Sequence, residues 1–150
     1  MRAVIQRVSD ARVVIEGNVK GRIGKGMVVL LGIQEGDTPE DTQWLAGKIV
    51  RLRIFDDAGG VMNLSLLETG GEILLISQFT LFASTKKGNR PSYSSAARPE
   101  TAVPLYQEFI RQLAEQADKP IQTGEFGARM QISLTNDGPV TVLIDSRNRE

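Results

Sequence analysis

The order of hydrophobic and polar positions along the chain predicts a protein of mixed α and β structure. Short alternating runs fill the first third of the sequence and are separated by polar or glycine-rich turns. The Gly17-Asn18 pair is typical of a two-residue hairpin, and we expect further turns at 9–10 and 24–26. The strands that this pattern predicts are 1–8, 11–16, 19–23 and 27–33.

The stretch 71–82 is the centre of the predicted fold. Its first part, 72–76, is almost wholly apolar, which is typical of a strand buried on both faces. Residues 61–69 show no pattern that assigns them to a helix or a strand. The other strands expected after residue 50 are 53–55, 125–135 and 140–145, the last two joined at 136–139.

Two segments have the spacing of amphipathic helices. The first follows Thr38, an expected N-cap that precedes a proline and two acidic residues, and extends to about residue 52. We expect Trp44 on this helix to anchor the core rather than to stack on a base. The second helix spans 100–117 and places Ala102, Leu105, Tyr106, Phe109 and Leu113 toward the core. The length and the absence of a linker predict one domain, 1–150.

Two missing residue types restrict the chemistry. The chain has no cysteine, which excludes disulfides, thiol nucleophiles and thiolate metal sites. It has no histidine either, which excludes a Ser-His-Asp triad and histidine-ligated zinc. We therefore expect no metal and no cofactor, and any hydrolysis must use other groups.

Charge and hydropathy indicate where the protein works. Eighteen basic residues balance eighteen acidic ones, so a nucleic-acid contact would need a local basic patch. No apolar run approaches the ~20 residues that span a bilayer, and the opening residues lack the core of a signal peptide. We expect a cytoplasmic protein without membrane contact.

Polar residues interrupt the central stretch after residue 76. Ser77, Gln78 and Thr80 interleave with Phe79 and other apolar residues. In a core strand, each such polar group must find a partner or cost about 1–3 kcal/mol. The pattern favours two interpretations equally: a strand that leaves the core with its polar groups bonded to backbone, or a functional site.

Several motifs resemble those of the D-aminoacyl-tRNA deacylases. Residues 77–81 (Ser-Gln-Phe-Thr-Leu) and 136–141 (Asn-Asp-Gly-Pro-Val-Thr) resemble two family signatures, and 1–8, 88–92 and 124–130 are similar to further family segments. The resemblance implies an α/β protein with a three-layer α/β/β fold, in which a barrel-like, mixed, largely antiparallel β core carries two helices on one side. It also implies an editing hydrolase that cleaves the ester of D-aminoacyl-tRNA, and of glycyl-tRNA, as a homodimer.

Ester hydrolysis needs an activated water and stabilisation of the developing oxyanion. The backbone amides of Phe79 and Thr80 are candidates for the second role. The hydroxyl of Ser77 or Thr80 could attack only if a lysine of the following loop acted as its base. The resemblance instead implies that the 2′-hydroxyl of the tRNA assists, while Ser77, Gln78 and Thr80 orient the substrate.

The loop 83–99 carries Lys86, Lys87, Arg90 and Arg98 but no acidic residue. Such a cluster is either solvated surface or a binding site for RNA phosphates. Solvated surface is the commoner explanation, but this loop starts directly after the candidate site, which makes an RNA role more plausible, and residues 88–92 also resemble the loop of the family. Binding of tRNA by Lys86 and Arg90 is therefore one expectation from the sequence.

Further roles follow from the resemblance. It implies that Phe126, Ala128 and Met130 line a pocket around the terminal adenosine, although ordinary strand packing explains them equally well. Alternation alone makes Arg7 either a surface residue of an edge strand or a buried brace, and the family uses it to hold the Gly-Pro turn.

The Gly138-Pro139 pair has two interpretations. Asp-Gly before an apolar strand is typical of a hairpin turn, and most X-Pro bonds are trans. The resemblance implies a cis bond whose two carbonyl oxygens enter the pocket of the partner subunit and exclude L-side chains.

Two other functions remain open: a non-catalytic RNA-binding module that uses residues 84–98, and a small dimeric scaffold.

Overall fold

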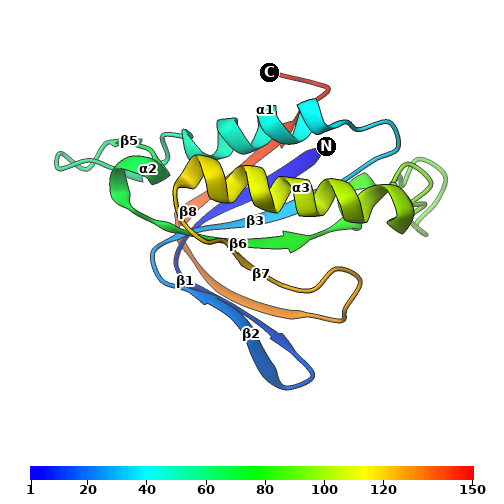
Figure 1. The fold of residues 1–150 in the computed structure, drawn as a ribbon, viewed down its shortest axis with the longest axis horizontal. Helices are drawn as coiled ribbons and strands as arrows, with labels where there is room; N and C mark the ends of the chain where they lie inside the picture. The colour runs from blue at the N-terminus through cyan, green and yellow to red at the C-terminus, as the bar shows by residue number, and fades with distance from the viewer.

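A computed structural model describes all residues, 1–150, and shows three layers (Figure 1). Two long helices cover one face of a strongly curved sheet, and the sheet curls into a second β layer on the other side. The predicted barrel-like α/β/β fold is confirmed. The elements are β1 (Arg2–Ile15), β2 (Asn18–Ile23), β3 (Gly26–Gly32), α1 (Pro39–Val50), β4 (Phe55–Asp56), β5 (Met62–Leu64), α2 (Leu66–Thr69), β6 (Glu72–Ser77), the 3₁₀ helix η1 (Phe79–Phe82), α3 (Pro99–Ala117), β7 (Gln122–Thr123) and β8 (Gln131–Asp145).

The main sheet is mixed, with strand order β2-β1-β3-β6-β7, and β8 pairs with β1. Antiparallel pairing joins β1 to β2, β3 and β8, whereas β3–β6 and β6–β7 are parallel. The long helices α1 and α3 pack against each other on one face, as expected. A third helix, α2, is a single short turn within the segment that the sequence pattern left unassigned.

Two predicted turns are wrong because the chain bends there instead of reversing. The expected turn at 9–10 lies inside the continuous strand β1, where the register against β8 shifts between Val8 and Asp10. The expected junction at 136–139 likewise lies inside β8, which also replaces the two predicted final strands. Both halves of β8 pair with the same strand, as in Leu134 with Ala11 and Val142 with Ile5. Polar residues thus occur at a bulge within a strand as well as at a turn, and the local sequence alone does not distinguish the two.

The central strand β6 separates two hydrophobic clusters, as the apolar run predicted. Ile73 and Leu75 point into the larger cluster beneath the helices, which includes the predicted core residues Tyr106 and Phe109. Leu74 and Ile76 point into a smaller cluster between the two β layers. Trp44 is partly buried against the larger cluster, and the guanidinium of Arg149 lies 4.3 Å from its ring centroid.

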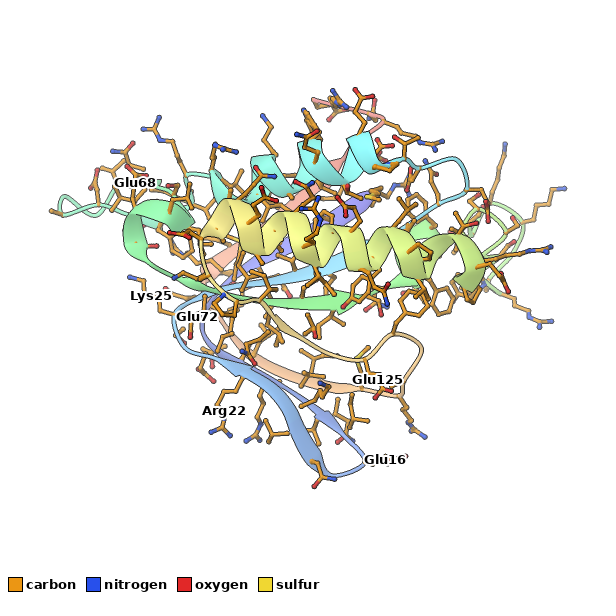
Figure 2. The ribbon with its side chains drawn as sticks, in the orientation of Figure 1. Glu16, Arg22, Lys25, Glu68, Glu72 and Glu125 are labelled. Atoms are coloured by element: carbon orange, nitrogen blue, oxygen red, sulfur yellow. The ribbon has the colours of Figure 1, made fainter.

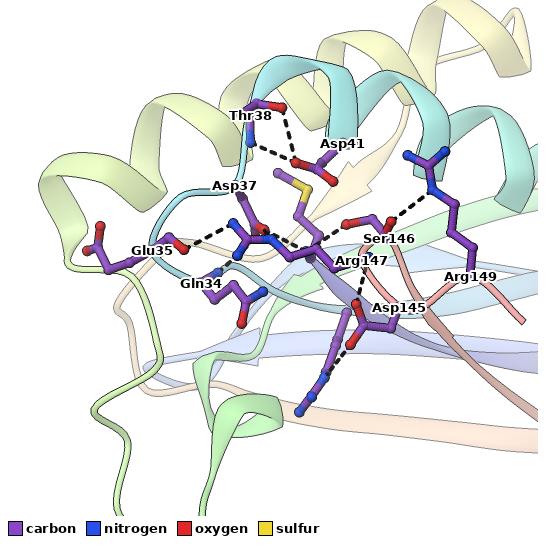
Figure 3. A network of polar contacts seen from close by, with 11 residues as sticks. Gln34, Glu35, Asp37, Thr38, Asp41, Asp145, Ser146, Arg147 and Arg149 are labelled. Carbon is purple, nitrogen blue, oxygen red and sulfur yellow. Dashed lines mark hydrogen bonds and ion pairs between the residues drawn. The ribbon is translucent and has the colours of Figure 1, made fainter.

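A buried ionic network fixes the loop between β3 and α1 (Figure 3). The Met1 amine lies 2.9 Å from Oδ1 of Asp37 and donates to Oγ of Ser146 at 2.8 Å, and both the amine and the Asp37 side chain are fully buried. Nε of Arg147 lies 3.0 Å from the same Asp37 oxygen. The network ties the N-terminus and the segment after β8 to residues 34–37. None of the helices is long and apolar enough to span a membrane.

We predict that Asp37→Ala strongly destabilises the fold. Removing one member of a buried ion pair leaves uncompensated charge and typically costs about 3 kcal/mol or more. Urea unfolding measures the change, and Glu108→Ala is the control because Glu108 pairs with Arg111 on the exposed face of α3, where ion pairs contribute little. Equal losses of unfolding free energy in the two variants would contradict this account of the network.

Candidate active site at the end of strand β6

A mostly apolar pocket of about 280 Å³ opens where β6 ends. The ends of β3 and β6, the loop between β7 and β8, and the start of α3 form its walls. Figure 2 shows Glu72 at the start of β6 and Glu125 on the loop at the opposite end of the strand. The lining residues are Leu31, Ile33, Ile76, Ser77, Gln78, Phe79, Ala97, Ala102, Phe126, Gly127, Ala128, Met130 and Ile132.

The backbone changes from strand to 3₁₀ helix at the rim of this pocket. Ser77 still pairs with Leu31, and the Gln78 amide donates to the Leu31 carbonyl at 2.7 Å. The chain then turns into η1, directly after the strand that the apolar run 72–76 predicted. The backbone amides of Leu81 and Ala83 donate the hydrogen bonds of this turn. Because the first N–H groups of a helix have no intrahelical acceptor, the turn itself does not use the amides of Phe79 and Thr80.

The close approach of η1 to β3 depends on Gly32. A Cβ atom at this position would lie 3.0 Å from Cβ of Leu81 and 3.1 Å from the Gln78 carbonyl oxygen. Such distances are tighter than ordinary van der Waals contact, so a larger residue would push the turn away from the sheet. The glycine therefore helps to fix the position of the two amides.

No basic side chain contacts the hydroxyl groups of the site. The Thr80 hydroxyl accepts a hydrogen bond from the side-chain amide of Gln78, and Ser77 is half-buried in the pocket wall. Lys86 and Lys87 are exposed and make no hydrogen bond or ion pair with either hydroxyl. Within this structure, neither hydroxyl has the adjacent base that a protein nucleophile requires.

The predicted adenosine-binding residues do lie together. Phe126, Ala128 and Met130 line the pocket, and they lie in a loop rather than in the strand expected at 125–135. The Phe126 ring packs against Tyr106, with 5.7 Å between the centroids. Tyr106 does not itself line the pocket; burial raises the pKa of this phenol to about 12, so the side chain that supports Phe126 is neutral.

Sequence reasoning missed part of the pocket wall. Ile33, Ala97 and Ala102 also line it, and the Ala97 amide donates to the Ile33 carbonyl at 2.9 Å. Ala102 was predicted only as a core-facing position of the second helix. The one available signal was the small size of the two alanines, one just before α3 and one in its first turn, which leaves room for a ligand.

Gly138 and Pro139 do not enter the pocket of their own chain. They are exposed in a bulge of β8: Gln6 pairs with Thr141 and Val8 with Asn136, so the four residues 137–140 face Arg7 alone. The Gly138–Pro139 peptide bond is cis, and Gly138 has φ +134°. Proline suits a bulge because it has no N–H to donate to a sheet.

Arg7 is the buried brace of this bulge. Only 7% of the residue is exposed. Its guanidinium donates to the carbonyl oxygens of Asp137 at 2.9 Å and Ile54 at 2.8 Å, and it pairs with Asp56 at 3.0 Å. The bulge is thus tied to the segment after α1.

The basic side chains of the loop 83–99 do not line the pocket, although Ala97 near the end of this loop does. Two backbone hydrogen bonds between Ser84 and Ser92 close its base. Lys86, Lys87 and Arg90 project from it without ion pairs, whereas Arg98 begins α3. The structure therefore brings residues 77–79 together with 126–130, and separates both groups from the basic side chains and from the bulge.

Comparison with known proteins identifies the family. The family model described as D-Tyr-tRNA(Tyr) deacylase matches residues 4–145. Proteins named D-aminoacyl-tRNA deacylase from Bacteroides thetaiotaomicron and Parabacteroides distasonis are 62% and 59% identical over 150 residues, which is 100% of this chain and 100% of each relative.

Two solved structures share the fold. One, titled c-Myc DNA Unwinding Element Binding Protein, has a TM-score of 0.90 at 40% identity, over 97% of this chain and 98% of the other. Another, titled a probable eukaryotic D-amino acid tRNA deacylase, has a TM-score of 0.80 at 18% identity, over 95% and 97% of the two chains. The resemblance seen in the motifs is confirmed: the chain belongs to the D-Tyr-tRNA(Tyr) deacylase family.

Proposed function

We propose that this protein is an editing hydrolase that cleaves the ester of D-aminoacyl-tRNA and releases tRNA and the free D-amino acid. The observation that carries the proposal is the turn at 77–80, which starts a 3₁₀ helix at the rim of an apolar pocket. The family membership of the whole chain supports the same reaction.

The backbone of this turn suits the stabilisation of an oxyanion. The amides of Phe79 and Thr80 lie at the start of η1, where helical N–H groups are free to bind an external acceptor. In the proposed reaction they donate to the oxygen of the tetrahedral intermediate. Donors of this kind are typically each worth about 10²–10³ in rate.

The catalytic base in this proposal is not a side chain. The chain has no histidine or cysteine, and no lysine contacts the Thr80 hydroxyl. We assign activation of the water to the 2′-hydroxyl of the terminal ribose, with Ser77, Gln78 and Thr80 orienting the ester. Positioning of this kind can lower a barrier by about 7 kcal/mol or more in well-oriented systems.

The tRNA end would occupy two adjoining regions. The terminal adenosine would lie against the wall formed by Phe126, Ala128 and Met130, a role that their shared place in the pocket supports. The exposed side chains of Lys86 and Arg90, with no acidic residue in their loop, suit contacts with backbone phosphates.

Selection against L-amino acids would require a second subunit. Gly138 and Pro139 are exposed and lie outside their own pocket, as expected of groups that act on another molecule. In the proposed homodimer, their carbonyl oxygens form a wall in the pocket of the partner subunit. This wall excludes an L-side chain and admits a D-side chain or glycine, so glycyl-tRNA is also a substrate. Arg7 keeps the wall in place.

Matched D- and L-aminoacyl-tRNA substrates test the proposed function. The wild-type protein should release the D-amino acid in large excess over the L-enantiomer, measured as loss of the labelled ester. Tight tRNA binding without ester release would instead identify a non-catalytic RNA-binding module. The absence of both binding and release would leave only a scaffold.

We predict that Thr80→Ala keeps much of the activity, whereas wild-type protein acts poorly on tRNA that ends in 2′-deoxyadenosine. The reason is that Thr80 orients the ester, while the 2′-hydroxyl takes part in the reaction. Single-turnover rates measure both effects, and intact D-aminoacyl-tRNA is the reference substrate. A trapped acyl group on Thr80, or full activity on the deoxy substrate, would contradict this mechanism.

We predict that Gly138→Ala weakens the discrimination between enantiomers or abolishes turnover. A Cβ atom on Gly138 would lie 2.9 Å from Cγ2 of Val140 and 3.1 Å from the Arg7 guanidinium, at a φ that L-residues rarely adopt. The control is Gly60→Ala, which also places an L-residue at a positive φ, +76°, but with nothing within 4 Å of the added Cβ atom.

The two glycine variants separate a functional role from a general backbone effect. Ratios of D to L rates should change in Gly138→Ala and stay at the wild-type value in Gly60→Ala. Sedimentation of the wild-type protein should show a dimer. An active monomer, or normal discrimination by Gly138→Ala, would mean that the bulge does not select chirality.

A further inference from the structure

Two aromatic rings lie exposed beside the entrance of the pocket. Phe79 is 57% exposed and Tyr93 is 39% exposed. Their ring centroids are 5.1 Å apart and their planes are inclined by 72°, an edge-to-face arrangement. Phe79 forms part of the pocket wall, whereas Tyr93 lies outside it. The pair therefore extends the apolar surface from the pocket to the protein exterior.

Both rings stand on a fixed backbone. Phe79 opens η1, directly after the amide of Gln78 that bonds to β3. Tyr93 follows the Ser84–Ser92 closure, and its carbonyl accepts from the Ala96 amide at 3.0 Å. Neither ring belongs to the two hydrophobic clusters or to the residues packed against them. The rings are thus held in place without being covered.

The loop that carries Tyr93 is basic. Lys86, Lys87 and Arg90 lie in the same loop as Tyr93, and none of them forms an ion pair. Residues 83–99 contain no acid that could neutralise them. Exposed aromatic rings next to unpaired cations are the combination that binds single-stranded nucleic acid, with rings stacking on bases and cations meeting phosphates.

We propose that Phe79 and Tyr93 form a stacking platform for the base of the nucleotide that precedes the terminal adenosine of the tRNA. The proposal rests on the proposed function, which places that adenosine in the pocket. Because Phe79 forms part of the pocket wall and its ring is exposed, the proposal has the RNA chain leave the pocket past this ring. Stacking is tolerant of sequence, so the platform serves tRNAs of any amino acid.

A second copy of this chain is the alternative occupant. Exposed aromatic rings also mark protein interfaces. In the proposed homodimer the bulge of the partner, and not its basic loop, enters the pocket, so the partner need not cover the rings. The three unpaired cations in the loop of Tyr93 favour RNA as the occupant. The experiment below includes this alternative as an outcome.

A cycle that combines a protein change with an RNA change tests the platform. The substrates are D-aminoacyl-tRNA with an intact nucleotide or an abasic one immediately before the terminal adenosine. The proteins are wild type, Tyr93→Phe, which keeps the ring, and Tyr93→Ala, which removes it. For each combination, kcat/KM is measured.

Wild type and Tyr93→Phe should each lose about tenfold in kcat/KM on the abasic substrate, within the range typical of one stacked base. For Tyr93→Ala, kcat/KM should fall less than about twofold on the abasic substrate, because this variant has already lost one of the two rings on which the base stacks. A general structural defect would lower kcat/KM for both substrates alike, so the ratio of the two values would stay as in the wild type. Equal ratios in all three proteins would therefore overturn the proposal.

Two further measurements make the result decisive. Sedimentation of Tyr93→Ala shows whether the ring holds subunits together; dissociation with an unchanged substrate ratio would assign the pair to a protein interface and overturn the proposal. The same comparison is made with binding: Kd values are measured for an unacylated RNA that ends in C-C-A, with and without the base that precedes the terminal adenosine. If no ester is cleaved, the proposed function fails, while the Kd values still test the platform.

Discussion

The parallel pairing of β3 with β6 is the interaction on which the rest of the structure depends. It runs from Gly26 opposite Glu72 to Leu31 opposite Ser77, with one hydrophobic cluster on each side. The apolar side chains of β6 are buried on both faces of the sheet. Polar residues can therefore follow this strand only where the chain leaves both hydrophobic clusters. The first polar residues after it therefore lie at the rim of the pocket, supported by the most buried part of the sheet.

This arrangement gives the site a rigid backbone and few reactive side chains. The Leu31 carbonyl and the absence of a side chain at Gly32 fix the turn that presents the Phe79 and Thr80 amides. Oxyanion stabilisation by backbone needs no particular side-chain chemistry. A chain without histidine or cysteine can therefore promote ester hydrolysis if the substrate is held in place and supplies the remaining group.

Sequence patterns predicted the parts of the fold that local chemistry determines, and missed those set by distant pairing. The buried strand at 72–76, both long helices and the core positions Tyr106 and Phe109 follow from periodicity. The bends of β1 and β8 do not, because a polar residue in a bulge and one in a turn look alike until the partner strand is known. In the site, motif resemblance pointed to Phe126 and Met130, whereas the small size of Ala97 and Ala102 was the only signal that these two residues offered.

Catalysis without a side-chain base is the central claim of this account. The pH dependence of single-turnover ester release by the wild-type protein tests it most directly. The rate should rise steadily between about pH 5.5 and 7.5 without an inflection, because the chain has no histidine or cysteine to titrate there. An inflection within this range that disappears when Lys86 or Lys87 is replaced by alanine would contradict the claim and identify a protein base.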